Sequence, residues 1–364
     1  MDLLEIKYHL KRLFNMARYK GLKCAFDYFL VQSLYNSDFV YEKIIYPLFP
    51  KSVFYPPFIE VEVTTKCMLR CVMCEHTYWK EKNQEMTFEQ LKSIVEQFPK
   101  LKWIGLTGIG ESFLNPDFLE MIRYVKSRGI ILELTDNFYL IDEKISRVLI
   151  ETGVERMVVS LDAATEKTYR KIRVGSDFNR VIRNIKTLRK LKKRMNSYYP
   201  EISFHYIISK YNLGEILLFI DLVKKIMDKE DTSIFFTSIL HPFPEIKDLV
   251  VDVPEEIMRQ AKEKSRKLGI KIGWNKNVPK EKDPITRCNE WTEPFIFVDG
   301  TVIPCCAGNE VNKRSYQKRT SMGNIFKTPF KEIWNGPKYR TLRKMIHEGK
   351  TPPACKYCTI YKVR

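Results

Sequence analysis

The sequence predicts an α/β protein in which a parallel sheet curls into a full or partial barrel, followed by a smaller cysteine-bearing domain. Strand-like and helical patterns alternate between residues 58 and 240, polar residues follow the strand-like runs, and a separate cysteine group lies near the C-terminus. The runs rich in β-branched and aromatic residues, which are typical of strands, lie at 59–64, 102–107, 130–134, 156–161, 202–208 and 233–240.

Helical patterns fall between these runs. One helix is predicted to begin at Thr87, because Gln90 three residues later completes a capping box and Phe88 and Leu91 open an apolar stripe. The other helical patterns cover roughly 116–127, 142–151, 178–194 and 212–228. This alternation of strands and helices predicts a parallel sheet with right-handed crossovers.

Residues 1 to about 55 form an N-terminal extension, predicted to begin with an amphipathic basic helix. Its apolar residues are Leu3, Leu4, Tyr8, Leu13 and Met16, and its basic residues are Lys7, Lys11, Arg12 and Arg18. The helix could pack against the main domain, or it could dock on a membrane surface or a partner. The sequence leaves both uses open.

Length and composition indicate a globular protein that resides in a reducing compartment. The chain has 364 residues, 44% of them apolar, enough for one large domain and a smaller one. No uninterrupted apolar stretch approaches the ~18 residues of a membrane-spanning helix, and no signal peptide opens the chain. We therefore expect a cytoplasmic protein, in which clustered cysteines indicate metal or redox chemistry before disulfides.

The net charge of +18 is unevenly spread. Residues 311–364 carry 14 Lys and Arg against Glu332 and Glu348, and residues 180–194 carry eight with no acid. The second run is expected to be the solvated face of a helix. The C-terminal concentration could attract phosphate, an acidic substrate, an anionic membrane or nucleic acid.

Three thiols, at the spacing Cys-x3-Cys-x2-Cys, lie on the loop that leaves the first predicted strand: Cys67, Cys71 and Cys74. Three thiolates are one fewer than a closed structural site needs, so a cubane iron–sulfur cluster held there would keep one iron open. A structural zinc with His76 as fourth ligand, or three ordinary buried cysteines, are the alternatives.

The carboxyl ends of the predicted strands carry polar residues, and in parallel sheets ligands bind at that edge. Glycines at 108 and 110 are expected to let a ligand approach the backbone closely. The residues at this predicted rim are Gly108, Gly110, Glu111, Ser112, Asp136, Asn137, Ser160, Asp162, Ser209, Lys210, Ser238 and His241.

A second cysteine group lies in the C-terminal fifth: Cys288, Cys305, Cys306, Cys355 and Cys358. Two separated segments supply four thiols, with Cys305 and Cys306 as alternatives for one position. A zinc ribbon uses similar pairs, so the spacing alone does not exclude zinc. Cys24 is expected to be a buried bystander.

In these motifs the chain resembles radical S-adenosylmethionine (radical SAM) enzymes, over residues 58 to about 240. Cys67, Cys71 and Cys74 match the family's cluster motif, and "GIGE" at 108–111 resembles its motif for the methionine amino group. "TDN" at 135–137 and "SLDAATEKTYRKIR" at 160–173 resemble its later strand ends. The chain departs from the family at Met73, where an aromatic is usual, and at Ser112, where proline often follows the glutamate.

The resemblance implies a partial (β/α)6 TIM-type barrel over residues 56–285. It also implies a 4Fe-4S cluster that binds S-adenosylmethionine, whose one-electron cleavage yields a radical that abstracts hydrogen from a substrate. The electron would come from an external donor such as flavodoxin or ferredoxin. The implied cofactor-binding residues are Gly108, Gly110, Glu111, Asn137, Ser160, Asp162 and Arg173.

Residues 286–364 resemble the SPASM or twitch domain of the same enzymes, in "PFIFVDGTVIPCC", "MGNIF", "IWNGPKYRTLR" and "CKYC". This resemblance implies one auxiliary 4Fe-4S cluster, with Cys288, Cys305, Cys355 and Cys358 as its ligands and Cys306 as the alternative to Cys305.

Three functions remain open. The resemblance favours oxidation or epimerisation of a small or carbohydrate-like molecule, because the N-terminal extension is too short for the leader-peptide clamp of many peptide-modifying relatives. A peptide-modifying maturase is the alternative within the family. A non-catalytic zinc protein that binds nucleic acid would explain the basic C-terminal region and the cysteines, but not the strand-end motifs.

Overall fold

The computed structural model describes residues 3–32, 55–228, 230–240, 242–275, 293–306 and 313–358. Its strands form a sheet in the order β10-β9-β8-β1-β2-β3-β4-β5-β6-β7. The strands are β1 (Phe58–Val61), β2 (Trp103–Leu106), β3 (Ile131–Asp136), β4 (Arg156–Ser160), β5 (Glu201–Ile208), β6 (Ser233–Ser238), β7 (Lys271–Asn275), β8 (Phe295–Ile296), β9 (Thr301–Ile303) and β10 (Gly323–Asn324).

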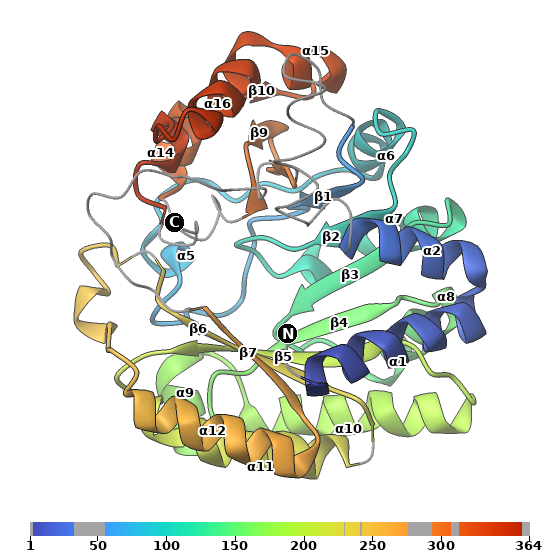
Figure 1. The fold of residues 1–364 in the computed structure, drawn as a ribbon, viewed down its shortest axis with the longest axis vertical. Helices are drawn as coiled ribbons and strands as arrows, with labels where there is room; N and C mark the ends of the chain where they lie inside the picture. The colour runs from blue at the N-terminus through green and yellow to red at the C-terminus, as the bar shows by residue number, and fades with distance from the viewer. Residues whose placement is uncertain are drawn as a thin grey trace.

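Strands β1 to β7 are parallel, and each pairs with the next along the chain. On its other side β1 pairs in parallel with β8, which continues into the antiparallel strands β9 and β10. In the described residues β7 and β10 are the two ends of this order, so the sheet forms a partial barrel (Figure 1). The predicted fold class is confirmed.

Helices cover the outside of the sheet and fill the connections (Figure 1). They are α1 (Leu3–Lys20), α2 (Leu22–Leu30), α5 (Glu75–Tyr78), α6 (Phe88–Glu96), α7 (Phe118–Ser127), α8 (Glu143–Thr152), α9 (Glu166–Ile172), α10 (Phe178–Arg194), α11 (Ile216–Met227), α12 (Glu255–Leu268), α14 (Arg314–Arg319), α15 (Phe330–Asn335) and α16 (Pro337–His347). The six predicted strands correspond to β1–β6. The sequence patterns did not predict β7 or the short strands β8 to β10. They also did not predict the helices α2, α5, α9, α12, α14, α15 and α16.

The predicted capping box starts α6. Thr87 Oγ1 accepts a hydrogen bond from the Gln90 backbone N–H at 3.2 Å, and Gln90 Oε1 accepts one from the Thr87 N–H at 2.9 Å. Each side chain therefore satisfies a backbone donor that the first helical turn leaves free.

Two helices begin later than predicted, because a buried asparagine holds the preceding loop. Asn115 Nδ2 donates to the carbonyls of Val63 and Met86, each at 2.8 Å, and α7 starts only at Phe118. Asn212 Nδ2 donates to the carbonyl of Asp162 at 2.8 Å, and α11 starts at Ile216. Both side chains tie strand ends together at the carboxyl edge of the sheet.

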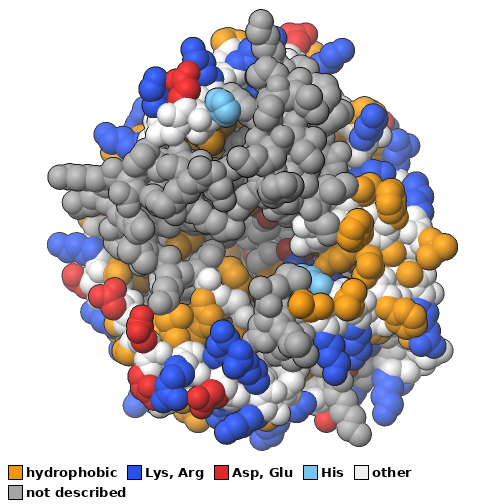
Figure 2. All heavy atoms as spheres, in the orientation of Figure 1, with side chains coloured by type: hydrophobic (Ala, Val, Ile, Leu, Met, Phe, Trp, Pro, Cys, Tyr) orange, Lys and Arg blue, Asp and Glu red, His pale blue; other side chains and the backbone are white. Residues whose placement is uncertain are grey.

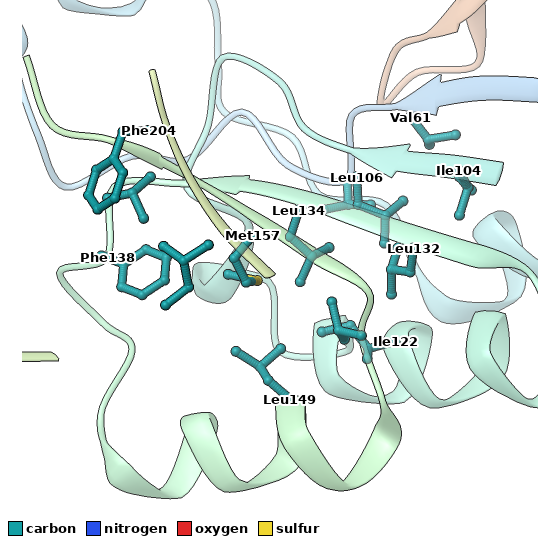
Figure 3. Packing of buried hydrophobic residues seen from close by; sticks show 14 of the residues in the cluster. Val61, Ile104, Leu106, Ile122, Leu132, Leu134, Phe138, Leu149, Met157 and Phe204 are labelled. Atoms are coloured by element: carbon teal, nitrogen blue, oxygen red, sulfur yellow. The ribbon is translucent and has the colours of Figure 1, made fainter. Parts of the chain in front are cut away.

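The core lies between the sheet and the helices. Figure 3 shows Leu106, Leu134 and Met157 on neighbouring strands, with Ile122 of α7 and Leu149 of α8 packed against the sheet. These side chains are fully or almost fully buried, and burial of this kind stabilises the fold by about 25 cal/mol per Å² of apolar surface.

Helices α1 and α2 pack at the amino ends of the strands. Met16 and Tyr28 lie in a buried cluster with Trp103 and Ile131, the first residues of β2 and β3. Met16 therefore packs against the main domain, which is one of the two predicted uses of this extension, and Leu13 packs against the same cluster. The side chains of Leu3 and Leu4 lie outside the described set.

Helix α10 carries the basic run 180–194. It buries Val181, Ile185 and Leu188 against the core, while most of its basic residues are partly or fully exposed. Lys192 is the exception, because it is buried and forms an ion pair with Glu230 at 2.9 Å. Arg189 pairs with the same Glu230 at 2.7 Å. Lys186, Lys190, Lys193 and Arg194 are exposed, as predicted for a solvated face.

Candidate active site

The cysteine loop leaves β1 and is fastened to the end of α9. Arg70 donates its backbone N–H to the carbonyl of Val174 at 2.8 Å, and Val72 donates to that of Ile172 at 3.0 Å. Apolar side chains surround the loop: Leu69, Ile172, Ile239, Phe243, Ile246 and Leu249. The thiols therefore lie in a largely apolar environment.

Burial raises the pKa of the Cys67 thiol to about 11 and that of the Cys74 thiol to about 12, and it also raises the pKa of Cys71. A soft metal centre binds thiolates, so loading this loop would release protons from all three groups. The donor set fits an iron–sulfur cluster, because three thiols on one loop can each hold a separate iron.

A single zinc ion fits less well. Within the described ranges, no three His, Cys, Asp or Glu side chains converge on one ion position. His76, the predicted fourth zinc ligand, is buried, and its Nδ1 lies 3.4 Å from Arg70 Nη1. Burial and the Arg70 charge lower its pKa.

Glu111 lies at the carboxyl end of β2 and is almost fully buried. Its Oε1 accepts a hydrogen bond from the Phe113 N–H at 3.2 Å, which caps a short turn, and its Oε2 accepts one from Asn137 Nδ2. Two predicted site residues, from different strands, are thus in direct contact.

A second carboxyl lies beside Glu111. One oxygen of Asp136 accepts the Phe138 N–H at 2.5 Å, while Oδ2 finds no donor among the described residues and faces the Glu111 carboxyl. Burial and the neighbouring Asp136 raise the pKa of Glu111 well above its ordinary value, and burial raises the pKa of Asp136. A cationic ligand group fits this pair, because it would replace the shared proton.

The positions that side chains would take at the two glycines before Glu111 are already occupied. A Cβ at Gly108 would lie 2.5 Å from Cγ of Glu62, and one at Gly110 would lie 2.2 Å from the backbone carbonyl oxygen of Thr64. The space that a side chain would fill is taken by the protein itself. Gly108 still lines the cavity described below with its backbone.

Asp162, at the end of β4, is fully buried and forms an ion pair with Arg173. Its other oxygen accepts the Ile207 N–H at 2.7 Å. Arg173 Nη1 lies 3.7 Å from the Cys71 sulfur, so this pair connects the end of the fourth strand to the cysteine loop. Ser160 ends β4 and is half-buried.

A cavity of about 260 Å³ opens beside Cys74 at the carboxyl ends of β5 and β6. Gly108, Ile109 and Cys74 line one side, and His205, Thr237 and Ser238 line the other. His205 Nε2 lies 2.8 Å from the Thr237 hydroxyl, and burial lowers the pKa of His205. Of these residues Gly108, Cys74 and Ser238 were among the predicted rim and cluster residues.

The C-terminal part of the chain completes this cavity. Arg314 and Gln317 of α14 line it together with Glu75. Arg314 is buried and forms an ion pair with Glu62, and its backbone N–H lies 3.2 Å from both Glu75 carboxylate oxygens. The guanidinium also stacks 3.6 Å from the centre of the Phe297 ring.

Sequence reasoning missed His205, Glu62 and Arg314. Glu62 carries a sequence signal, since it directly follows β1 at the carboxyl edge of the sheet, where ligands bind in parallel sheets. The sequence gives no signal that singles out Arg314, because it is one of many basic residues in its region.

The second cysteine group is described in part. Cys305 is buried, and Cys306 Sγ lies 3.6 Å from Glu293 Oε2. The Cys358 N–H donates to the Cys355 carbonyl at 3.0 Å, and burial raises the pKa of Cys355 to about 12. The predicted ligand Cys288 and the rim residue His241 lie outside the described residues.

Comparison with known families gives two matches. The profile of the radical SAM superfamily matches residues 61–223, and that of the SPASM iron–sulfur cluster-binding domain matches residues 288–359.

Two curated relatives match over most of their length. The tungsten-containing aldehyde ferredoxin oxidoreductase cofactor-modifying protein of Pyrococcus furiosus is 25% identical over 325 residues, 83% of this chain and 87% of that protein. The AdoMet-dependent heme synthase of Methanosarcina barkeri is 26% identical over 335 residues, 85% of this chain and 90% of that protein.

Among solved structures, Streptococcus suis SuiB bound to S-adenosylmethionine superposes with a TM-score of 0.64 at 16% identity, covering 89% of this chain and 80% of SuiB. SuiB bound to the precursor peptide SuiA gives a TM-score of 0.62 at 14% identity, covering 85% and 72%. At this identity the likeness concerns the fold. In the described part of the chain, no helix is both long enough and apolar enough to cross a membrane.

Proposed function

Because this chain belongs to the radical SAM superfamily and carries a C-terminal SPASM domain, we propose that it oxidises or epimerises a small, carbohydrate-like molecule held beside Cys74. When bound, the 4Fe-4S cluster, S-adenosylmethionine and the auxiliary cluster supply the hydrogen abstraction and an electron-transfer partner. Cys67, Cys71 and Cys74 would hold the first cluster, and Cys288, Cys305 or Cys306, Cys355 and Cys358 the auxiliary one.

The chain's own residues divide into those that hold the cofactor and those that hold the substrate. Glu111 and Asp136 offer two buried carboxyls to the cofactor's ammonium group, with Asn137 orienting Glu111. Arg173 offers charge near Cys71, held in place by Asp162. The apolar residues around the loop would exclude water from the reacting groups.

The cavity beside Cys74 is the observation that carries the substrate class. Its volume is about 260 Å³, and five of its lining side chains can hydrogen-bond hydroxyl groups: His205, Thr237, Ser238, Arg314 and Gln317. Apolar side chains, among them Ile207, Leu240 and Phe243, line much of the rest and would contact the carbon skeleton of the substrate. His205 stays neutral near pH 7, since burial lowers its pKa, and could therefore accept a proton from a substrate hydroxyl as the neighbouring C–H bond is lost.

The names of the two curated relatives also support a small molecule, since one is a cofactor-modifying protein and the other a heme synthase. The peptide-modifying alternative draws on SuiB, which was crystallised with a precursor peptide. That likeness concerns the fold alone, so we place a peptide substrate second to a small molecule.

Deuterium transfer tests the proposal even while the substrate is unidentified. The reconstituted enzyme is incubated anaerobically with S-adenosylmethionine, reductant and extract from cells grown in D₂O, separated into small-molecule and peptide fractions. We expect deuterated 5′-deoxyadenosine with the small-molecule fraction, and much less of it with the His205→Ala variant.

Cys67→Ala is the control and should give no 5′-deoxyadenosine. If only the peptide fraction yields deuterated 5′-deoxyadenosine, our proposal is wrong and the peptide-modifying alternative is supported. A Cys67→Ala variant as active as the parent would instead contradict the assignment of the cysteine loop.

A further inference from the structure

Helices α1 and α2 expose large apolar side chains to solvent. We call Ile6, Leu10, Phe14, Leu22, Phe26 and Phe29 the apolar stripe; Leu10 is 62% exposed, Phe14 64%, Leu22 81% and Phe26 58%. Figure 2 shows hydrophobic side chains gathered over the region where Figure 1 draws these two helices. A contiguous exposed apolar surface of this kind marks an interaction site.

The spacing of the stripe gives each helix a second apolar face. Ile6, Leu10 and Phe14 recur every four residues, which places them on one side of α1, while Met16 on the other side is buried against the barrel. In α2, Tyr28 is buried while Leu22 and Phe26 are exposed. A helix that only packed on the barrel would present polar residues outward.

Basic residues border the stripe. Lys7, Lys11, Arg18 and Lys23 are exposed, and Asp27, the acid with a described side chain in these helices, is buried and paired with Lys102 at 2.9 Å. Lys11 also reaches Asp231 at 2.9 Å, but its side chain remains more than half exposed. Apolar residues edged by cations match the surface of an anionic lipid bilayer.

We propose that the protein docks on anionic membrane surfaces through the apolar stripe, with α1 and α2 lying in the plane of the headgroups. The helices cover the amino ends of the strands, where Trp103 and Ile131 begin β2 and β3. The cavity at Cys74 lies at the carboxyl ends. A docked molecule therefore keeps its cavity turned away from the bilayer.

A second copy of the chain is a poorer occupant. A symmetric dimer through this face would bring Lys7, Arg18 and Lys23 of both copies together, and like charges at an interface repel each other. An anionic surface attracts the same residues.

Vesicle sedimentation tests the proposal with the full-length, anaerobically reconstituted protein. We expect it to sediment with vesicles that contain phosphatidylglycerol, and much less with pure phosphatidylcholine. The exposed double variant Leu10→Ser/Phe14→Ser should lower the partition coefficient at least about tenfold. Lys7→Gln and Lys23→Gln should each lower it about fivefold at low salt.

Matched controls lie on other helices. Leu218→Ser removes an exposed leucine of α11 that is 53% exposed, and Lys262→Gln removes an exposed lysine of α12; both should bind like the parent. Thermal unfolding checks that every variant folds. No binding to either vesicle, equal binding to both, equal loss in the controls, or a dimer that Phe14→Ser dissociates in the absence of lipid would overturn the proposal.

Discussion

At the scale of single residues, the buried carboxyls of Glu111 and Asp136 define the proposed cofactor site. Glu111 caps a turn through the Phe113 N–H and contacts Asn137, so the side chain that we propose for cofactor binding also holds local structure.

Replacing Glu111 by Gln should separate these roles. The variant keeps the shape but offers a weaker acceptor to the cofactor's ammonium group, a charge-assisted hydrogen bond worth about 1.5–3 kcal/mol. We expect S-adenosylmethionine to bind roughly ten- to a hundredfold more weakly, with unchanged iron content, in anaerobic equilibrium dialysis. Equal affinity of variant and parent for S-adenosylmethionine would show that Glu111 only caps the turn.

The same pair predicts a pH dependence of stability. The pKa values of Glu111 and Asp136 are raised above the ordinary 4.5 and 3.8, so the folded protein holds a proton that the unfolded chain has lost. Their stabilising contribution is complete below those ordinary values and is lost as the pH rises through the folded pKa values.

Urea unfolding of the iron-free protein should therefore show a free energy of unfolding that falls as the pH rises above about 5, by at most about 1.4 kcal/mol per pH unit for one proton. Asp136→Asn removes one member of the pair and should flatten this slope. Burial by itself also raises the pKa of Glu111, so the double variant Glu111→Gln/Asp136→Asn should remove the slope altogether. A double variant that keeps the parent's slope would show that the proton is held elsewhere.

At the scale of elements, the N-terminal helix is held to the barrel by a buried ion pair. Arg12 Nε lies 2.9 Å from Glu201 Oε2, and both side chains are 7% exposed. Arg12→Ala leaves the carboxylate buried without its charge partner, which should lower the free energy of unfolding by about 3–5 kcal/mol. Lys11→Ala, on the same helix, breaks a largely exposed pair with Asp231 and should change it by less than about 1 kcal/mol. Denaturant titration measures the free energy of unfolding of both variants. Similar decreases in the two variants would show that apolar contacts, and not the Arg12–Glu201 pair, hold α1.

At the scale of the whole molecule, the cysteine loop and the C-terminal cysteines are separate sites joined by contacts around the cavity. Arg314 of α14 pairs with Glu62, which follows β1, across 252 residues of sequence. Because the two cysteine groups come from separate segments of the chain, we expect their clusters to load independently.

We expect about eight irons per chain, and about half of that in the variant with Cys67, Cys71 and Cys74 all replaced by Ala. Iron and sulfide analysis after anaerobic purification measures this. If the triple variant contains no iron and one equivalent of zinc, the C-terminal cysteines bind zinc and not an auxiliary cluster.

The sequence by itself determined the alternation of strands and helices, the start of α6 and the spacing of the thiols, because these patterns arise from neighbours within a few residues. The alternation of Ile59 and Val61 indicates a strand from its own residues, and the Thr87–Gln90 capping box closes within one helical turn. The same locality made Glu111 and Asn137 recognisable as rim residues, since each follows a strand.

Only the tertiary structure decided which of these residues meet. The curvature of the sheet brings Asp136 beside Glu111, Arg173 to Cys71 and Arg314 to Glu62, and it places Glu62 where a side chain at Gly108 would lie. It also decided that Met16 is buried and Phe14 exposed, although both are apolar residues of one helix. Local periodicity carries no information about partners this far apart, because their contact depends on how the strands order and curve as a whole.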